Sequence, residues 1–374
     1  MRSYLKKNLW LSCLILIIGI ILVYVIGSWL YRSSYFKDVR RELRFKEVEN
    51  YPRYKSYFDD VKEYLTQNPY TFPSNFYPGR IFVSIASYRD PECPKTIQSL
   101  LEMAARPDLI TIGVCEQNAP EDFYFNVRPG PGIKVLHMSD KEARGPTWAR
   151  YLAQRMWEGE EYFLQIDAHT RFEKNWDSTV KRMLSQCPSK KPILTQYLSE
   201  YNIKNNKKEP KRRGPLYVQK FDDTDGFTRI QSDWSFDRSS VPFPSKAWSA
   251  CFSFGKASML RDVMYDPFTP YLFFGEEMDY TLRLFTHGYD FYSPQENIAH
   301  TNFDRSYRKT FWEQTDQRAV EKLSRLRLYH KFKLLPSLPD GLKTDLNYFN
   351  MGTSRTIKDY ERFARIDIAK EKLI

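Results

Sequence analysis

Short apolar runs alternate with helix-like polar segments through the middle of the chain. Four runs have the composition of buried strands, and they cover residues 81–86, 109–115, 133–136 and 161–167. Between them, the end of segment 87–104 and residues 145–157 place apolar side chains at helical spacing. Strands that alternate with helices predict a mostly parallel α/β sheet, in which ligands bind at the carboxyl ends of the strands.

The most apolar segment, 9–30, contains no charged residue. At a rise of ~1.5 Å per helical residue it is long enough to cross a hydrocarbon core of ~30 Å. It is too long for the core of a signal peptide, and no small-x-small cleavage site follows it, so we predict a retained signal anchor. Positive charges lie on both sides of the segment, so the positive-inside rule does not decide its orientation.

The order of segments predicts a single-pass membrane protein with one large folded body. We expect these five parts: a tail at 1–8, the transmembrane anchor at 9–30, a stem at 31–80, the body at 81–312 and a helical extension at 313–374. The stem is predicted from its charged, tyrosine-rich composition and its prolines. The same order of segments also suits a receptor or a lectin, so it indicates location better than activity.

Composition excludes several classes of protein. With 42% hydrophobic residues the chain can bury a real core, and the net charge of +11 comes from scattered lysines and arginines. The one dense basic cluster, 204–213, is typical of a surface loop, and the alternative is contact with a phosphate or an acidic acceptor. No zinc finger or heptad lies near it, so we expect no nucleic-acid partner. None of the five cysteines forms a CxxC pair, which argues against a zinc site built on sulfur.

Asp167 and His169 are the sharpest chemical signal, because they follow directly on a predicted core strand in the sequence "QIDAHTRF". Residues two apart in an extended chain point the same way, so both side chains can converge on one ion. A carboxylate and an imidazole suit Mn²⁺ or Zn²⁺, and a diphosphate in the same site favours the harder ion. The alternative is that both residues only cap the next helix.

Three other positions carry candidate chemistry, each beside a structural alternative. Arg144 precedes a Gly-Pro helix start, where free backbone N–H groups favour an anion. Glu276, Glu277 and Asp279 follow an aromatic turn, where they could form an acceptor-facing wall or simply favour the helix dipole. His300 follows an apolar pair and could complete a three-ligand metal site, although a lone histidine is more often structural.

Three long stretches in this order resemble the polypeptide α-N-acetylglucosaminyltransferases. They are "IFVSIASYRDPECPKTIQSLLEMA", "ARGPTWARYLAQRMWEGEEYFLQIDAHTRFEKNWD" and "PYLFFGEEMDYTLRLFTHGYDFYSPQENIAH". The resemblance runs from about residue 81 to about residue 312. Enzymes of that family use UDP-GlcNAc to modify hydroxyproline or threonine of proteins, so the resemblance implies a nucleotide-sugar donor and a polypeptide acceptor.

The resemblance implies a GT-A glycosyltransferase fold, which is a Rossmann-like mixed sheet flanked by helices, here behind an N-terminal transmembrane helix. It also implies that Asp167 and His169 hold the divalent ion that bridges the UDP phosphates, with His300 as the third protein ligand. Mn²⁺ is the expected ion and Mg²⁺ the second candidate. Residues implied to bind the nucleotide or its phosphates are Ser87, Tyr88, Arg89, Asp90, Arg144 and Asp167.

Glu276 and Glu277 are the implied catalytic residues, because they lie where that family places a Gly-Glu-Glu beside the sugar. Products of the family keep the α configuration, which requires either a carboxylate nucleophile or same-face attack; the sequence does not choose, and our hypothesis is same-face attack. Asp279 departs from the expected pattern at this helix start, with an unknown effect on sugar choice.

The anchor favours a Golgi enzyme, a type II protein with a luminal catalytic domain, acting on Thr or Ser of secreted or surface proteins. Soluble members of the family instead modify a hydroxyproline of a ubiquitin-ligase subunit. The alternatives are a transferase of the same fold with another UDP-sugar or a glycan acceptor, and an inactive membrane-anchored module that binds sugar or protein.

Overall fold

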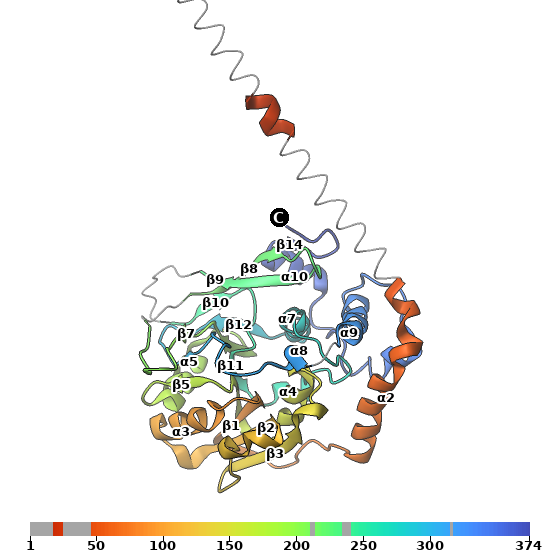
Figure 1. The fold of residues 1–374 in the computed structure, drawn as a ribbon. Helices are drawn as coiled ribbons and strands as arrows, with labels where there is room; N and C mark the ends of the chain where they lie inside the picture. Colours follow the sequence, from red (N-terminus) through yellow and green to blue (C-terminus); the bar gives the residue numbers. More distant parts are fainter. Residues whose placement is uncertain (1–17, 25–45, 210–213, 234–240, 315–316) are drawn as a thin grey trace, which may run out of the picture.

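An eight-stranded mixed sheet forms the centre of the molecule in the computed structural model, which describes residues 18–24, 46–209, 214–233, 241–314 and 317–374. The strand order is β10-β12-β6-β11-β4-β1-β2-β3. The strands β1, β2 and β3 lie together near the bottom of the view in Figure 1. The strands are β1 (Tyr77–Tyr88), β2 (Ile110–Asn118), β3 (Ile133–Ser139), β4 (Glu160–Asp167), β6 (Pro192–Thr195), β10 (Phe243–Ser245), β11 (Phe252–Lys256) and β12 (Asp290–Ser293).

The four strands predicted from the apolar runs are confirmed, and they form the parallel half of the sheet. β1 pairs in parallel with both β2 and β4, and β3 pairs in parallel with β2. β11 is antiparallel to β4 and to β6, so the sheet as a whole is mixed. The register Ala86↔Asp167 brings the carboxyl ends of β1 and β4 together, which is where the sequence predicts ligands to collect.

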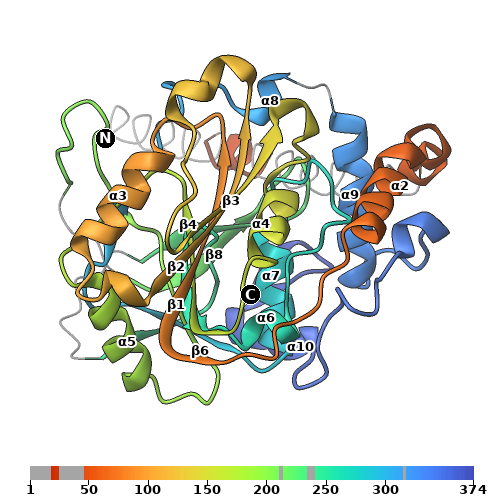
Figure 2. The same ribbon diagram turned by 90° about the horizontal axis from the view of Figure 1, so that it is seen from below.

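Helices cover both faces of the sheet (Figure 2). α3 (Cys93–Met103) and α5 (Trp176–Gln186) lie on one face, and α4 (Pro146–Gln154) and α7 (Glu276–Thr286) lie on the other. Successive residues of β1 alternate between the two cores: Ile81 and Val83 pack with α3 and α5, whereas Phe82 packs with α4 and α7. Burial on both faces explains why the β1 run is apolar at every position but Ser84.

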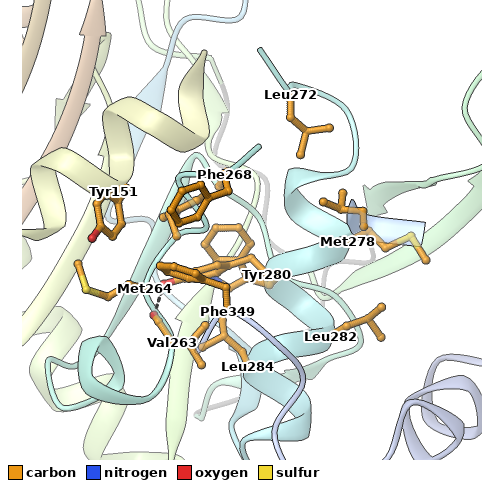
Figure 3. Packing of buried hydrophobic residues seen from close by; sticks show 14 of the residues in the cluster. Tyr151, Val263, Met264, Phe268, Leu272, Met278, Tyr280, Leu282, Leu284 and Phe349 are labelled. Atoms are coloured by element: carbon orange, nitrogen blue, oxygen red, sulfur yellow. Dashed lines mark hydrogen bonds between the residues drawn. The ribbon is translucent and has the colours of Figure 1, made fainter. Parts of the chain in front are cut away.

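The start of α7 is held by a dense aromatic core (Figure 3). The Tyr280 hydroxyl donates to the Val263 carbonyl at 3.0 Å, and the Tyr280 ring stacks on Tyr265 with 4.5 Å between centroids. Both residues are fully buried, and Phe349 packs in the same cluster. The first turn of α7, which carries Glu276 and Glu277, is therefore fixed in place.

The predicted stem and extension both contribute to the folded body. α2 (Tyr51–Gln67) lies inside the segment predicted as a stem, yet it buries Phe58 and Val61, and Tyr64 packs edge-on against Trp148 at 5.1 Å. The region after residue 312 is mainly helical, with a small terminal hairpin that was not predicted. Its elements are α9 (Arg318–Lys331), α10 (Ile357–Ala364), β14 (Ile366–Asp367) and β15 (Lys372–Leu373), with α8 (Phe311–Gln314) just before it.

Two small sheets and several short helices complete the described chain. β5 (Thr170–Phe172), β13 (Ala299–Thr301) and β7 (Ser199–Glu200) form one sheet, and β8 (Leu216–Phe221) pairs with β9 (Thr228–Ser232). The short helices are η1 (Pro107–Leu109), η2 (Pro120–Phe125), η3 (Asp140–Glu142), α6 (Met259–Asp262) and η4 (Asp340–Lys343). The four cysteines in the described part of the chain are buried and free.

The predicted anchor at 9–30 falls largely outside the described residues. Its described part, 18–24, is helical and exposed. Within the described ranges, no helix combines the length and the apolar character that crossing a membrane requires.

Candidate active site

One cavity of about 370 Å³ lies where the carboxyl ends of β1 and β4 meet the first turn of α7. Its walls come from the end of β1, the start of α4, the end of β4, the start of α7 and the segment 302–312. Of the residues predicted from the sequence, it brings together Ser87, Tyr88, Asp90, Asp167, His169, Glu276 and Glu277. Residues from distant parts of the chain thus form one pocket, as the resemblance implies.

Asp167 and His169 converge in this pocket. His169 Nε2 lies 3.8 Å from Asp167 Oδ2, and its other ring nitrogen, Nδ1, lies 2.8 Å from Asp90 Oδ2. Asp167 remains partly exposed to the cavity, with 24% of its side chain accessible. A carboxylate oxygen and an imidazole nitrogen at this separation can both bind one divalent metal ion.

Arg150 lies between the two acidic groups of the pocket, and the sequence did not single it out. Its guanidinium donates to Asp167 Oδ1 at 2.9 Å and also contacts Glu276 Oε1. Burial opposes the charge, but the neighbouring Glu276, Tyr265 and Asp167 raise the pKa of Arg150 well above its ordinary value. The pocket therefore holds a permanent positive charge beside the candidate metal ligands, which suits a phosphate.

The two adjacent glutamates have different surroundings. Glu276 is buried and accepts hydrogen bonds from Arg150 and from the Tyr265 hydroxyl, the latter at 2.8 Å. Glu277 is partly buried; it accepts from the Ala250 backbone N–H at 3.0 Å and from the Tyr197 hydroxyl at 3.4 Å. Burial raises the pKa of Glu277 to about 7. Glu276 is thus committed to protein contacts, whereas Glu277 is the carboxyl with capacity for a ligand.

The loop after β1 only partly follows the prediction. Ser87, Tyr88 and Asp90 line the cavity, but the Arg89 side chain turns away to form ion pairs with Asp122 and Glu121, both at 2.6 Å. Beside this loop, Gln117 at the end of β2 is buried, and its Oε1 atom has no hydrogen-bond partner among the described residues. A polar edge of a nucleobase would satisfy such an atom.

Arg144, predicted to face the phosphates, lies outside the cavity lining. Its guanidinium donates to the Tyr57 carbonyl at 3.4 Å, lies 3.6 Å from Asp60 and stacks over the Trp148 ring. The backbone at Gly145 is in a left-handed conformation, with φ of +88°, as the helix α4 begins. Contact with α2 draws the side chain away from the pocket, whereas Arg150, in the second turn of α4, lines the cavity.

Arg305 is a second cation that the sequence did not indicate. It lines the cavity from the segment after β13 and lies over the rings of Phe273 and Trp312, with 5.2 Å to each centroid. Within the described ranges no carboxylate lies within ion-pair distance of Arg305. Burial lowers its pKa, with the Asp167 charge acting in the opposite direction.

The structure does not bring His300 to Asp167 and His169. His300 Nε2 lies 3.0 Å from Glu173 Oε1, and the register places His300 opposite Arg171, whereas the Asn302 backbone N–H donates to the His169 carbonyl at 3.2 Å. Across the part of the chain that the structure describes, no three His, Cys, Asp or Glu side chains are grouped to hold a metal. The predicted three-ligand set is therefore reduced to two, because His300 lies two residue pairs along the ladder from the position level with His169.

A second cavity of about 470 Å³ adjoins the first. The two share one aromatic wall with an arginine, formed by Phe273, Phe274, Arg305, Phe311 and Trp312. Phe274 and Trp312 are unusually exposed for such large apolar side chains, at 47% and 45%. An exposed aromatic wall beside a polar pocket is typical of a surface that binds a partner.

Comparisons with known proteins bear on the family and the fold of this chain. The family model described as Glycosyltransferase (GlcNAc) matches residues 80–129 and 125–370. The structure is similar to that of GalNAc-T7 with UDP, GalNAc and Mn²⁺, with a TM-score of 0.52 and 13% identity over 76% of this chain and 56% of that one. It is also similar to S. aureus TarS in complex with UDP-GlcNAc, with a TM-score of 0.44 and 11% identity over 72% and 73% of the two chains.

The similarity to solved structures supports the fold and nothing finer. No curated protein matches significantly. The chain spans little more than half the length of GalNAc-T7, and the identity is low, so that comparison shows the fold alone: an α/β GT-A fold with a mixed central sheet. The predicted GT-A fold is thereby confirmed.

Proposed function

This chain belongs to the glycosyltransferase (GlcNAc) family, and we propose that it transfers N-acetylglucosamine from UDP-GlcNAc to a hydroxyl of Thr, Ser or hydroxyproline in a polypeptide, with retention of the α configuration. The observation that carries this proposal is the convergence of Asp167 and His169 in a cavity that Arg150 and Glu277 also face. Two ligands for one metal ion, a fixed cation and an available carboxyl are the groups that transfer from a nucleotide sugar requires.

The donor is proposed to lie along the carboxyl ends of β1, β2 and β4. The uncommitted Gln117 Oε1 supports a place for the uracil beside Ser87 and Tyr88. Arg150 and Arg305 supply positive charge on the path from that place to the glutamates. This arrangement follows the rule that open α/β sheets bind nucleotides beyond the carboxyl ends of their strands.

Asp167 and His169 are proposed to hold a divalent ion, with Mn²⁺ expected and Mg²⁺ as the second candidate. Their facing Oδ2 and Nε2 atoms, 3.8 Å apart, support this assignment. When bound, the ion supplies charge neutralisation at the phosphates of the departing UDP. Arg150 contributes a second, permanent charge to the same end, because its pKa lies far above any working pH.

Glu277 is proposed to bind hydroxyls of the sugar, while Glu276 holds Arg150 in position. In the transfer, the acceptor oxygen bonds to the anomeric carbon, the bond from that carbon to the phosphate oxygen breaks, and the acceptor proton passes to the departing phosphate. The hydrogen bonds that commit Glu276 to Arg150 and Tyr265 favour this same-face course over nucleophilic attack by Glu276. A trapped glycosyl-enzyme adduct on either glutamate would overturn it.

The polypeptide acceptor is proposed to approach through the second cavity. Its aromatic wall, shared with the donor pocket, supports this route because a chain lying there would present a hydroxyl to the sugar. We further propose that the protein is anchored in the Golgi membrane by residues 9–30, with its catalytic body in the lumen. That part of the proposal rests on the uncharged apolar segment in the sequence.

The test is a transfer assay with the full-length protein, Mn²⁺, a panel of UDP-sugars and peptides that contain Thr, Ser or hydroxyproline. We expect transfer from UDP-GlcNAc, and loss of transfer in Asp167→Ala. If the wild-type protein neither transfers sugar nor releases UDP from any donor, the enzyme proposal fails. Transfer from another UDP-sugar alone would replace the donor but keep the mechanism.

A further inference from the structure

Asp90 does not have the surroundings of a nucleotide-binding residue. Its side chain is 1% exposed, and both carboxylate oxygens are already used by the protein. Oδ2 lies 2.8 Å from His169 Nδ1, while Oδ1 accepts from the Glu92 backbone N–H at 3.0 Å. The Tyr307 hydroxyl donates to the carboxylate at 3.0 Å, and Arg308 Nε lies 3.1 Å from Oδ2.

The contact with His169 determines what that ring can do. A carboxylate accepts hydrogen bonds only, so it favours the ring form that carries a proton on Nδ1. The lone pair is then on Nε2, which is the nitrogen that lies 3.8 Å from Asp167 Oδ2 in the cavity. Without Asp90, a neutral imidazole is free to carry its proton on Nε2 instead, where it cannot bind a metal.

The same carboxylate also fixes the segment that covers the pocket. Tyr307 and Arg308 follow β13 closely, and the neighbouring residues Arg305 and Thr310 line the cavity. Arg308 additionally donates to the Tyr88 carbonyl at 3.1 Å, which ties this segment to the end of β1. Asp90 thus joins the histidine, the β1 end and the covering segment through a single buried group.

We propose that Asp90 is a positioning residue that holds His169 in the Nδ1–H form, with Nε2 directed beside Asp167, and so creates the divalent-cation site. This inference rests on the metal dependence of the proposed function. It assigns to Asp90 a role other than the nucleotide contact that the sequence predicted. A carboxylate behind a ligating histidine typically changes metal affinity by about 10–100-fold when it is removed.

The first test measures the ring form in the metal-free, full-length protein. With ¹⁵N-labelled histidine at pH 8, the imidazole nitrogens report which one carries the proton, and His169→Gln identifies the signal among the five histidines. We expect the Nδ1–H form in the wild type and a mixture of forms in Asp90→Ala. Asp177→Asn is the matched control, because Asp177 is equally buried but accepts from the backbone N–H groups of Ala105 and Arg106.

The second test measures Mn²⁺ affinity by electron paramagnetic resonance of the free ion, with and without UDP. We expect about tenfold weaker binding in Asp90→Asn or a larger loss in Asp90→Ala, and wild-type binding in Asp177→Asn. An unchanged ring form and unchanged Mn²⁺ affinity in a folded Asp90→Ala protein would overturn the proposed role of Asp90 and leave the proposed function standing. If the wild type binds no Mn²⁺ even with UDP, both this inference and the metal part of the proposed function fail.

Discussion

Two clusters of buried charge lie on either side of α7, and they differ in whether a ligand can reach them. The pocket cluster consists of Arg150, Asp167, Glu276 and Glu277, and it lines the cavity. The core cluster consists of Asp266, Asp279, Arg327 and Lys331, which lies towards the C-terminal helices. Arg327 Nε and Lys331 Nζ lie 2.7 and 3.2 Å from Asp266, and Lys331 lies 2.6 Å from Asp279.

This difference in access indicates that the core cluster stabilises the fold and that the pocket cluster is available for function. The side chains of Arg327 and Lys331 are wholly buried, so their charges can be satisfied only by the protein. In the pocket cluster, Asp167 is 24% exposed, Glu277 is only partly buried, and both line the cavity, so a ligand can reach both carboxylates. Buried charge that no cavity reaches supports the fold, whereas buried charge that faces a cavity marks a candidate site.

The largest expected effect on stability comes from breaking the core cluster. In Asp266→Asn, Arg327 loses the carboxylate that compensates its charge and Lys331 keeps only Asp279. We expect the free energy of unfolding to fall by about 3–5 kcal/mol. Urea unfolding followed by circular dichroism measures this. Affinity for UDP at a temperature where the variant is folded should stay within twofold of wild type; a selective loss of UDP binding with unchanged stability would contradict the assignment.

Breaking the pocket cluster should reduce sugar transfer rather than the stability of the fold. Arg150→Met removes the cation between Asp167 and Glu276, and we expect transfer to fall by about 10²–10³-fold because charge on the departing phosphate is no longer compensated. Arg150→Lys should recover part of this loss. Steady-state kinetics gives the comparison, and wild-type rates in a folded Arg150→Met protein would remove Arg150 from the mechanism.

The two clusters should also respond to pH with opposite signs. Glu277, with its pKa raised to about 7, keeps a proton in the fold that the unfolded chain releases, so its contribution to stability is lost as pH rises from about 4.5 to about 7, by up to about 3 kcal/mol. Asp266, with its pKa lowered to about 2 by Arg327 and Lys331 against the effect of burial, loses its contribution as pH falls below its ordinary range towards 2.

Unfolding curves from pH 3 to pH 8 for the wild type, Glu277→Gln and Asp266→Asn separate the two contributions. Glu277→Gln should flatten the decline between about pH 4.5 and 7 and leave the acid limb unchanged. Asp266→Asn should do the reverse. If Glu277→Gln leaves the decline in stability between about pH 4.5 and 7 unchanged, the raised pKa of Glu277 is not the cause of that decline.

The smallest effect is expected at the aromatic wall between the cavities. Trp312→Ala should raise the KM for a peptide acceptor by about tenfold through loss of stacking, while donor hydrolysis stays near wild type. Tyr348→Ala serves as the matched control, because Tyr348 is similarly exposed, at 42%, but lies outside both cavities. An equal change in both variants would show that the wall is not an acceptor surface.

The sequence predicted the features that depend on local pattern. Four apolar runs became β1 to β4, and the Asp-x-His spacing placed Asp167 and His169 together because alternation along an extended chain is a local property. The family resemblance then brought Glu276 and Glu277 to the same place. These predictions needed no knowledge of how distant segments pack.

The residues that the sequence missed or misplaced all depend on tertiary contacts. Arg150 sits in the middle of an amphipathic helix, where an arginine is usually a solvent-facing residue, and only packing of α4 against α7 turns it into the pocket. Arg144 was drawn to α2, a helix in a segment predicted to be a stem. His300 was displaced by the register between β13 and β5, which a single sequence does not encode in any local pattern.

The most direct test of the central claim is a titration of UDP with Mn²⁺ into the full-length wild-type protein, Asp167→Asn and the control Asp177→Asn, followed by calorimetry. If Asp167 and His169 form the donor site, the wild type and the control bind UDP only when Mn²⁺ is present, and Asp167→Asn binds at least about tenfold more weakly. Equal UDP affinity in Asp167→Asn and the wild type would contradict the account.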